Sequence, residues 1–338
     1  MQAGSEIGRS ATCAFSTVVI HIAGKDHAKQ RCCVKEMRSH CLGALIFCLF
    51  AFAPLVAHAQ EPKFLGGSYI ITNDSIGQAR DRWQSSVVSG SLLYHFGNSD
   101  ELAVPLGQIF ELRATSQIIT PENLSAPQIG DRPFAGILEF GVATHGNLSV
   151  LEISAGADLT FVGPQTGMID FQRFLHRQLG FPLPNEVGNE VPNNTYLSGH
   201  IEFGRSFGSD LRWRPFGELR AGTETLARVG VDLTWGALGM DDLLVREAVT
   251  GQRLPSILGA DVSGWSWLVG GDVALVEDSR YLPDSFGVEP LDRARVRAGA
   301  HWQNERISAF YGLTWLSKEF SGQPESQLVG AAQLRLRF

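Results

Sequence analysis

Residues Leu151 to Phe161 read LEISAGADLTF, and the alternation within this stretch predicts the fold. Successive side chains of a β-strand point to opposite faces, so a period of two residues indicates a strand with one apolar and one polar face. The apolar face consists of Leu151, Ile153, Ala155, Ala157, Leu159 and Phe161, and the other face of Glu152, Ser154, Gly156, Asp158 and Thr160.

The last residues of the chain, Leu328 to Phe338, alternate in the same way. One face ends in Phe338, and the other carries Arg335 and Arg337. A soluble β-sandwich would bury such an apolar face equally well. In a secreted Gram-negative chain, however, an amphipathic strand with a terminal Phe is typical of an outer-membrane barrel, and we predict that fold.

Ten further segments have the composition and length of strands. Together with the two above they predict an all-β, antiparallel transmembrane β-barrel of about 12 strands. Aromatic residues near strand ends, among them Trp83 and Trp235, are candidates for interfacial girdles. The ten segments are Gly67–Thr72, Ser86–Phe96, Gly107–Ile119, Ile137–Thr144, Tyr196–Phe207, Arg214–Glu224, Ala227–Trp235, Trp265–Val276, Arg295–Trp302 and Ile307–Ser317.

Residues 37–59 have the order of a secretory signal peptide. A short basic opening at Met37 precedes the uncharged, mostly apolar run Leu42–Ala57, and Ala57-His58-Ala59 provides an A-x-A cleavage site. We therefore expect translation to start at Met37 and residues 1–36 to come from an overextended gene model. Residues 60–338 would form a single barrel domain in the bacterial outer membrane.

Cysteine usage and charge narrow the possible partners. All five cysteines precede Gln60, which excludes disulfides and cysteine metal sites from the mature chain. The net charge is −7 and the mature region has no basic run, so we expect no nucleic-acid partner. The expected partners are outer-membrane lipid and, during biogenesis, the barrel-assembly machinery; we expect the barrel to be a monomer.

One segment departs from the strand pattern. Met168 to Leu179 (MIDFQRFLHRQL) predicts a short helix that ends at Gly180. Gln172 and His176 are four residues apart and so share a face of this helix. A helix in an extracellular loop of a barrel needs a reason, and loops often carry function.

Four short motifs resemble the outer-membrane lipid A 3′-O-deacylase family. They cover Ile71 to Pro192 in the order and spacing of the family, under half of the mature chain. The motifs are Thr72-Asn73-Asp74; Asp81-Arg82-Trp83-Gln84-Ser85-Ser86; Thr120-Pro121 with Asp131-Arg132-Pro133-Phe134-Ala135-Gly136; and Val162-Gly163-Pro164 with Gln172, His176, Gly180 and Asn189-Glu190.

The resemblance implies a twelve-stranded barrel that hydrolyses, with Ca²⁺, the ester linking the 3′ acyloxyacyl chain to lipid A of lipopolysaccharide. The family's histidine matches His176, and its Asn-Asp pair matches Asn73 and Asp74. Its hydroxyl residue falls on Ser85, with Ser86 as the alternative. Substrate contacts are expected at Gln172 and Arg132.

The chain departs from the family at two places. The position of the family's second acidic residue is occupied by Pro182, so Glu186 or Glu190 would supply that carboxylate; we take Asp74 and Glu190 as the metal ligands. The stretch PENLSAPQIG, Pro121–Gly130, also lacks the expected basic residues.

The residue types suit ester hydrolysis. A histidine takes up a proton from water near neutral pH, and a calcium ion held by oxygen ligands stabilises an oxyanion. Asn73 and Ser85 can orient groups or donate hydrogen bonds.

Two other functions remain open from the residues. An outer-membrane phospholipase would use a serine nucleophile with histidine, but no convincing Ser-His-Asn set is present. A non-catalytic barrel, either a porin or a lapsed family member, fits the missing acidic and basic positions.

Overall fold

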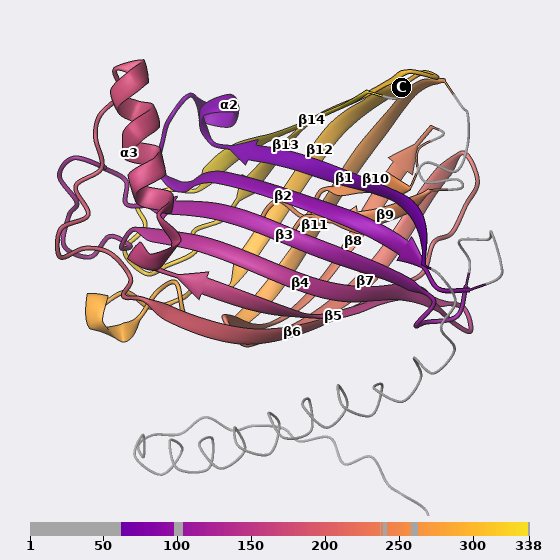
Figure 1. Ribbon diagram of the computed structural model, residues 1–338, viewed down its shortest axis with the longest axis horizontal. Coiled ribbons are helices and arrows are strands. Elements are labelled where there is room, and N and C mark those ends of the chain that lie inside the picture. The colour runs from indigo at the N-terminus through magenta and orange to yellow at the C-terminus, as the bar shows by residue number, and fades with distance from the viewer. Residues whose placement is uncertain (1–61, 98–103, 237, 239–241, 258–262, 337–338) are drawn as a thin grey trace, which may run out of the picture. The chain divides into compact units, whose positions relative to one another are not determined.

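The computed structural model describes residues 62–97, 104–236, 238, 242–257 and 263–336. Within them, twelve antiparallel strands close into a barrel in which β1 lies between β14 and β2 (Figure 1), and this confirms the predicted fold. The predicted signal peptide, residues 1–36 and Phe338 lie outside the described residues. The barrel strands are β1 Lys63–Asn73, β2 Trp83–His95, β3 Ile109–Thr120, β4 Ala135–Leu148, β5 Leu151–Val162, β6 Asn194–Gly204, β7 Leu211–Ala221, β8 Glu224–Trp235, β11 Gly264–Ser279, β12 Arg293–Gln303, β13 Ile307–Leu316 and β14 Gln327–Leu336.

The barrel wall is apolar outside and polar inside. In β5, Leu159 is 41% exposed whereas its neighbour Asp158 is 4% exposed. A soluble sandwich buries the apolar face, so this inversion is the one expected of a wall that faces lipid. Trp235 is exposed on the outer surface, as a girdle residue should be, but Trp83 is completely buried and the girdle prediction for it was wrong.

A hairpin that the sequence pattern did not reveal lies inside the barrel. Its strands β9 (Leu243–Arg246) and β10 (Arg253–Ile257) belong to the connection between β8 and β11. This connection leaves the wall at the end where β1 begins and β14 ends, which we call the terminal end. The connection that carries the helix Met168–Leu179 lies at the opposite end, here called the α3 end.

The hairpin is bonded to strands all around the wall. Arg246 pairs with Glu202 of β6 at 2.7 Å and with Asp232 of β8 at 2.8 Å. Ser256 lies 2.7 Å from Ser68 of β1, on another part of the wall. A segment can reach these distant strands together only from within the lumen.

The helices and turns are short. Among the residues that the structure describes they are α2 (Ser75–Gln78), α3 (Met168–Leu179), and two 3₁₀ turns, Pro164–Thr166 and Asp284–Phe286. In the part of the chain that the structure describes, no helix is long and apolar enough to cross a membrane. Helix α3 has the bounds that the sequence predicted, Met168–Leu179.

The hairpin predicts a closed lumen. In planar bilayers the wild-type barrel should show no steady ion conductance, because β9 and β10 fill the passage. Replacing residues 243–257 with a short Gly-Ser linker should produce conducting steps, with folding checked by heat-modifiable migration in SDS gels. Steady conductance by the wild type would contradict this placement of the hairpin.

Candidate functional site

Helix α3 lies against the outer surface of the barrel wall. Gln117 of β3 lines the lumen cavity, so the next residue, Ile118, points outward. Ile118 is nevertheless buried, because it packs with Ile169 of α3 and with Phe134. Figure 1 shows α3 beside the ends of β2, β3 and β4.

The predicted shared face of α3 is the face turned toward the wall. Gln172 and His176 are both buried, as is Ile169 one turn earlier. The helix ends at Gly180, whose backbone is left-handed (φ 73°), a conformation that glycine adopts without steric cost. This turn brings the carbonyl of Pro182 back to His176.

Ser85 reaches α3 because β2 contains a β-bulge. The pairing of β2 with β3 shifts register between Gln84 and Ser86, so Ser85 is an extra residue without its own partner. Gln84 lines the lumen cavity, whereas the hydroxyl of Ser85 accepts a 3.1 Å hydrogen bond from Gln172 Nε2 on α3. Bulges commonly re-aim a side chain in this way beside functional sites.

Asp81 joins the two sides of the site. Its Oδ2 lies 2.8 Å from His176 Nε2, and its Oδ1 accepts the hydroxyl hydrogen of Ser85. Gln172 Nε2 also approaches both oxygens of this carboxylate at 3.4 Å. The structure therefore brings the predicted residues His176, Ser85 and Gln172 together around an aspartate that the sequence analysis did not select.

The hydrogen bonds of His176 fix where protons lie. The Pro182 carbonyl oxygen, 2.6 Å from Nδ1, can only accept, so Nδ1 carries hydrogen and donates. Nε2 then faces the Asp81 carboxyl, and two acceptors do not form a hydrogen bond with each other. One proton is therefore shared between Nε2 and Asp81 Oδ2 in this arrangement.

Asp74 lies just behind this cluster and is completely buried. Its Oδ2 accepts the backbone N–H of Arg82 at 2.8 Å and the side-chain amide of Gln327 at 3.3 Å. Burial raises the pKa of the Asp74 carboxyl to about 8, the Arg82 N–H opposes the rise, and the negative charge of Asp81 adds to it.

Two buried oxygen atoms around Asp81 have no hydrogen-bond partner: Asp74 Oδ1 and Gln172 Oε1. A hard cation such as Ca²⁺ takes carboxylate and amide oxygens as ligands, so this donor set suits calcium. Among the described residues no group of three or more His, Cys, Asp or Glu side chains is arranged to hold a metal. Neutral oxygens, water or substrate would have to complete such a site.

Glu190, the other predicted metal ligand, belongs to a second acidic group. Burial raises its pKa to about 7, and Glu186 and Asp170 add to the effect. Its backbone pairs with Phe134, so two of the family-like motifs meet here. Its charged neighbours differ from those of Asp74, so the two predicted ligands lie in different surroundings.

Asn73 and Arg132 bond to partners outside the cluster. The side chain of Asn73 accepts the backbone N–H of Ser75 at 2.7 Å and supports the first turn of α2. Arg132 is buried on the lumen side, where its guanidinium pairs with Glu319 at 2.7 Å. Ser86, the alternative to Ser85, takes an ordinary place in the ladder between Asn73 and Ile118.

The sequence marks Asp81 only by its place in a motif. It begins the Asp-Arg-Trp-Gln-Ser-Ser motif, four residues before Ser85, in the only motif that also supplies the hydroxyl. What distinguishes Asp81 is that its carboxylate reaches both His176 and the hydroxyl of Ser85. This proximity depends on the bulge in β2.

Comparison with known proteins gives one family and several barrels. The family model described as "Outer membrane protein LpxR" matches residues 44–338. The solved structure of LpxR from Salmonella typhimurium has a TM-score of 0.66 at 16% identity, covering 81% of this chain and 100% of that one. No curated protein sequence matches.

Other outer-membrane barrels are less similar. The NanC porin has a TM-score of 0.38 at 6% identity and covers 81% of this chain and 100% of its own. The beta domain of the Bordetella autotransporter BrkA has a TM-score of 0.38 at 11% identity with the same coverage. Neither bears on the function.

The raised pKa of Asp74 predicts a pH-dependent stability. Below pH 4 the carboxyl is protonated in both states; between pH 4 and about 8 the unfolded chain ionises while the fold retains the proton, so stability falls as pH rises. Asp74→Asn should abolish this contribution. We expect its thermal midpoint in calcium-free detergent to gain on wild type between pH 4 and pH 8 and to level off above. Parallel pH profiles for both proteins would contradict the burial argument.

Proposed function

This chain belongs to the LpxR family of outer-membrane proteins, and from that premise we propose that it is a lipid A 3′-O-deacylase. The reaction would hydrolyse the ester that links the 3′ acyloxyacyl chain to lipid A, releasing a fatty acid and leaving a free sugar hydroxyl. Export by a cleaved signal peptide in residues 37–59 and insertion by the barrel-assembly machinery are part of this proposal.

The observation that carries the proposal is the place of the site on the outside of the wall. His176, Asp81 and Ser85 lie between α3 and the outer face of β2 and β3, not in the lumen. A lipid that remains in the membrane can reach this position laterally. A water-soluble substrate passing through a barrel could not.

The exposed face of α3 fits an acyl substrate. Four large apolar side chains are between 38% and 63% exposed: Phe171, Phe174, Leu175 and Leu179. At 100° per residue they form an arc that adjoins Gln172 and His176, while Asp170, Arg173 and Arg177 occupy another arc. An apolar patch of this kind beside reactive polar groups indicates a lipid-binding surface.

The residues can move the protons that hydrolysis requires. Once the proton shared by His176 and Asp81 has passed to solvent, the lone pair of Nε2 can take a proton from water as the water oxygen bonds to the acyl carbon. The same nitrogen can return that proton to the departing sugar oxygen when the ester bond breaks. The Pro182 carbonyl keeps Nδ1 protonated and so reserves Nε2 for this task.

The hydroxyl of Ser85 and the amide of Gln172 would orient the ester, and the geometry favours Gln172 over the lumen-facing Arg132 for substrate contact. Asp74 Oδ1 and Gln172 Oε1 would hold a calcium ion, which would supply positive charge for the developing oxyanion. Glu190 is also proposed as a metal ligand. Its carboxylate belongs to the second acidic group, and its Oε1 has no hydrogen-bond partner.

Two other functions receive less support from the geometry. A porin needs an open lumen, and the hairpin β9–β10 occupies it. A serine nucleophile of the phospholipase type would give its hydroxyl proton to histidine, whereas Ser85 donates to Asp81. A lapsed family member would lack a complete proton-transfer set, but His176, Asp81 and Ser85 are assembled here.

Lipid A mass spectrometry tests the proposal. Cells expressing the protein should lose the 3′ acyloxyacyl group from lipid A, and the loss should require Ca²⁺. His176→Gln should reduce the rate by about 10³-fold, since a positioned proton-transfer residue contributes about 10²–10⁴-fold.

The matched control is His145→Gln. His145 also lies 2.8 Å from a carboxylate, that of Glu111, but in the lumen, and this variant should keep wild-type activity. Altered phospholipids with intact lipid A would indicate a phospholipase. Unchanged lipids in cells with folded, surface-located protein would refute both enzymatic functions.

A further inference from the structure

Strand β1 leaves the barrel wall earlier than the strands on either side of it. Its last residue, Asn73, pairs with Ser86 of β2 and with Gly330 of β14. Beyond that point β2 continues through residues 83–85 and β14 through residues 327–329, with no strand between them. On its β1 side, the bulged part of β2 therefore has no neighbouring strand to bond its backbone.

The side chain of Gln327, at the first position of β14, bridges this gap. Its Oε1 accepts the backbone N–H of Gln84 at 3.2 Å, and its Nε2 donates to the backbone carbonyl of Arg82 at 2.7 Å. Nε2 also lies 3.3 Å from Asp74 Oδ2. Gln327 is 1% exposed, so no solvent competes for these bonds.

The segment that Gln327 holds is under backbone strain. Trp83, between the two residues bonded by Gln327, has a left-handed backbone (φ 49°), which is sterically unfavourable for a bulky residue. Its indole is completely buried with Leu282 and Phe320. Such a conformation persists only where surrounding contacts fix it.

We propose that Gln327 is a positioning residue for the deacylase reaction: its amide replaces the missing stretch of β1 and holds residues 82–84 so that the bulge presents Ser85 and Asp81 to His176. The inference rests on the proposed function. It assigns a role to a residue that lies more than a hundred positions after the family-like motifs and whose only contact with the proposed site residues is the one with Asp74.

The test compares two glutamines of the same strand. Gln327→Met keeps the length of the side chain but removes its hydrogen bonds. Gln333→Met is the matched control, because Gln333 is also buried and donates to the backbone of Tyr69 at 2.6 Å, one strand away from the bulge. Gln327→Asn, which retains the amide but is shorter by one methylene, serves if the methionine variant does not fold.

Two readouts are taken on folded protein in detergent: hydrogen–deuterium exchange of peptides covering residues 82–86, and kinetics on lipid A. For Gln327→Met or Gln327→Asn we expect exchange of the Gln84 amide to rise at least about tenfold. We also expect kcat to fall about 10- to 100-fold with KM within about twofold, as for lost transition-state orientation. Gln333→Met should change neither.

The inference is overturned if exchange at residues 82–86 is unchanged, if kcat is unchanged despite faster exchange, or if Gln333→Met has the same effects. If wild-type protein hydrolyses no lipid A, the proposed function fails, and the positioning role for catalysis is withdrawn with it. The exchange data still decide separately whether Gln327 holds the bulge.

Discussion

The early exit of β1 from the barrel wall is the constraint on which the candidate site depends. A strand in a membrane barrel must have its backbone groups bonded on both sides. Because β1 ends at Asn73 while β2 continues, residues 82–85 need other partners. Asp74 accepts the N–H of Arg82, and Gln327 bonds the carbonyl of Arg82 and the N–H of Gln84. The bulge at Ser85 and the left-handed Trp83 both lie in this segment.

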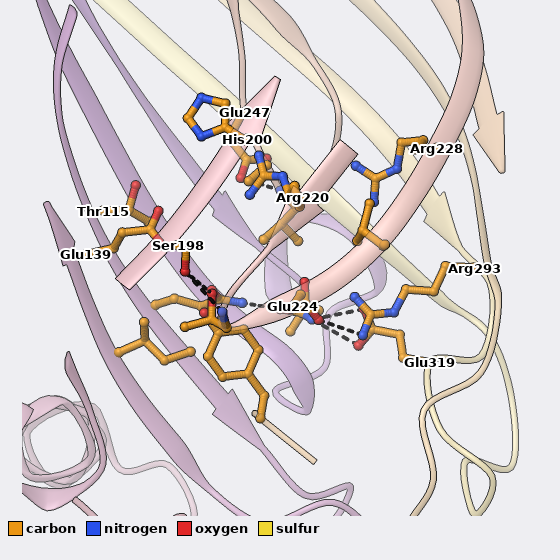
Figure 2. A pocket seen from close by; sticks show the side chains of 18 of the residues that line it. Thr115, Glu139, Ser198, His200, Arg220, Glu224, Arg228, Glu247, Arg293 and Glu319 are labelled. Carbon is orange, nitrogen blue, oxygen red and sulfur yellow. Dashed lines mark hydrogen bonds and ion pairs between the residues drawn. The ribbon is translucent and has the colours of Figure 1, made fainter. Parts of the chain in front are cut away.

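The barrel separates two sets of charged groups that serve different purposes. The lumen contains a cavity of about 70 Å³ lined by arginines and carboxylates, and Figure 2 shows Arg220, Arg228 and Arg293 gathered there with Glu224 and Glu319. These groups pair with one another inside the lumen, between side chains of different strands. An example is Arg293 of β12 with Glu224 of β8 at 2.7 Å. The cluster around His176 lies outside the wall instead, next to the apolar arc of α3. Paired charges thus fill the interior, whereas the candidate site lies on the outer face of the wall.

Much of the fold could be predicted from the sequence because it depends on local periodicity. Alternation along Leu151–Phe161 and its counterparts located every barrel strand, and the Gly180 stop located the end of α3. The inner hairpin was missed because β9 and β10 are short and lie among turns, with their stability coming from contacts such as Arg246 with Glu202 and Asp232. Periodicity carries no signal for such distant pairs.

The site was predictable only in part, and the same reason applies. Helical spacing correctly placed Gln172 and His176 on one face of α3, which the structure buries, and motif order selected Ser85. Asp81 depends on a bulge, and Gln327 on the point where another strand ends, neither of which is visible along the chain. Asn73 and Arg132, chosen from their motifs, bond instead to α2 and to Glu319. A motif names residues but does not say which side of the wall they face.

We propose that His176 and Asp81 act as one proton-transfer unit between α3 and the barrel wall. A double-mutant cycle on kcat for lipid A hydrolysis tests it most directly, using His176→Gln, Asp81→Asn and the double variant. If the pair acts as a unit, Asp81→Asn alone lowers kcat nearly as much as His176→Gln, and the double variant is little worse than either. Full activity of Asp81→Asn, or losses that multiply in the double variant, would contradict the account.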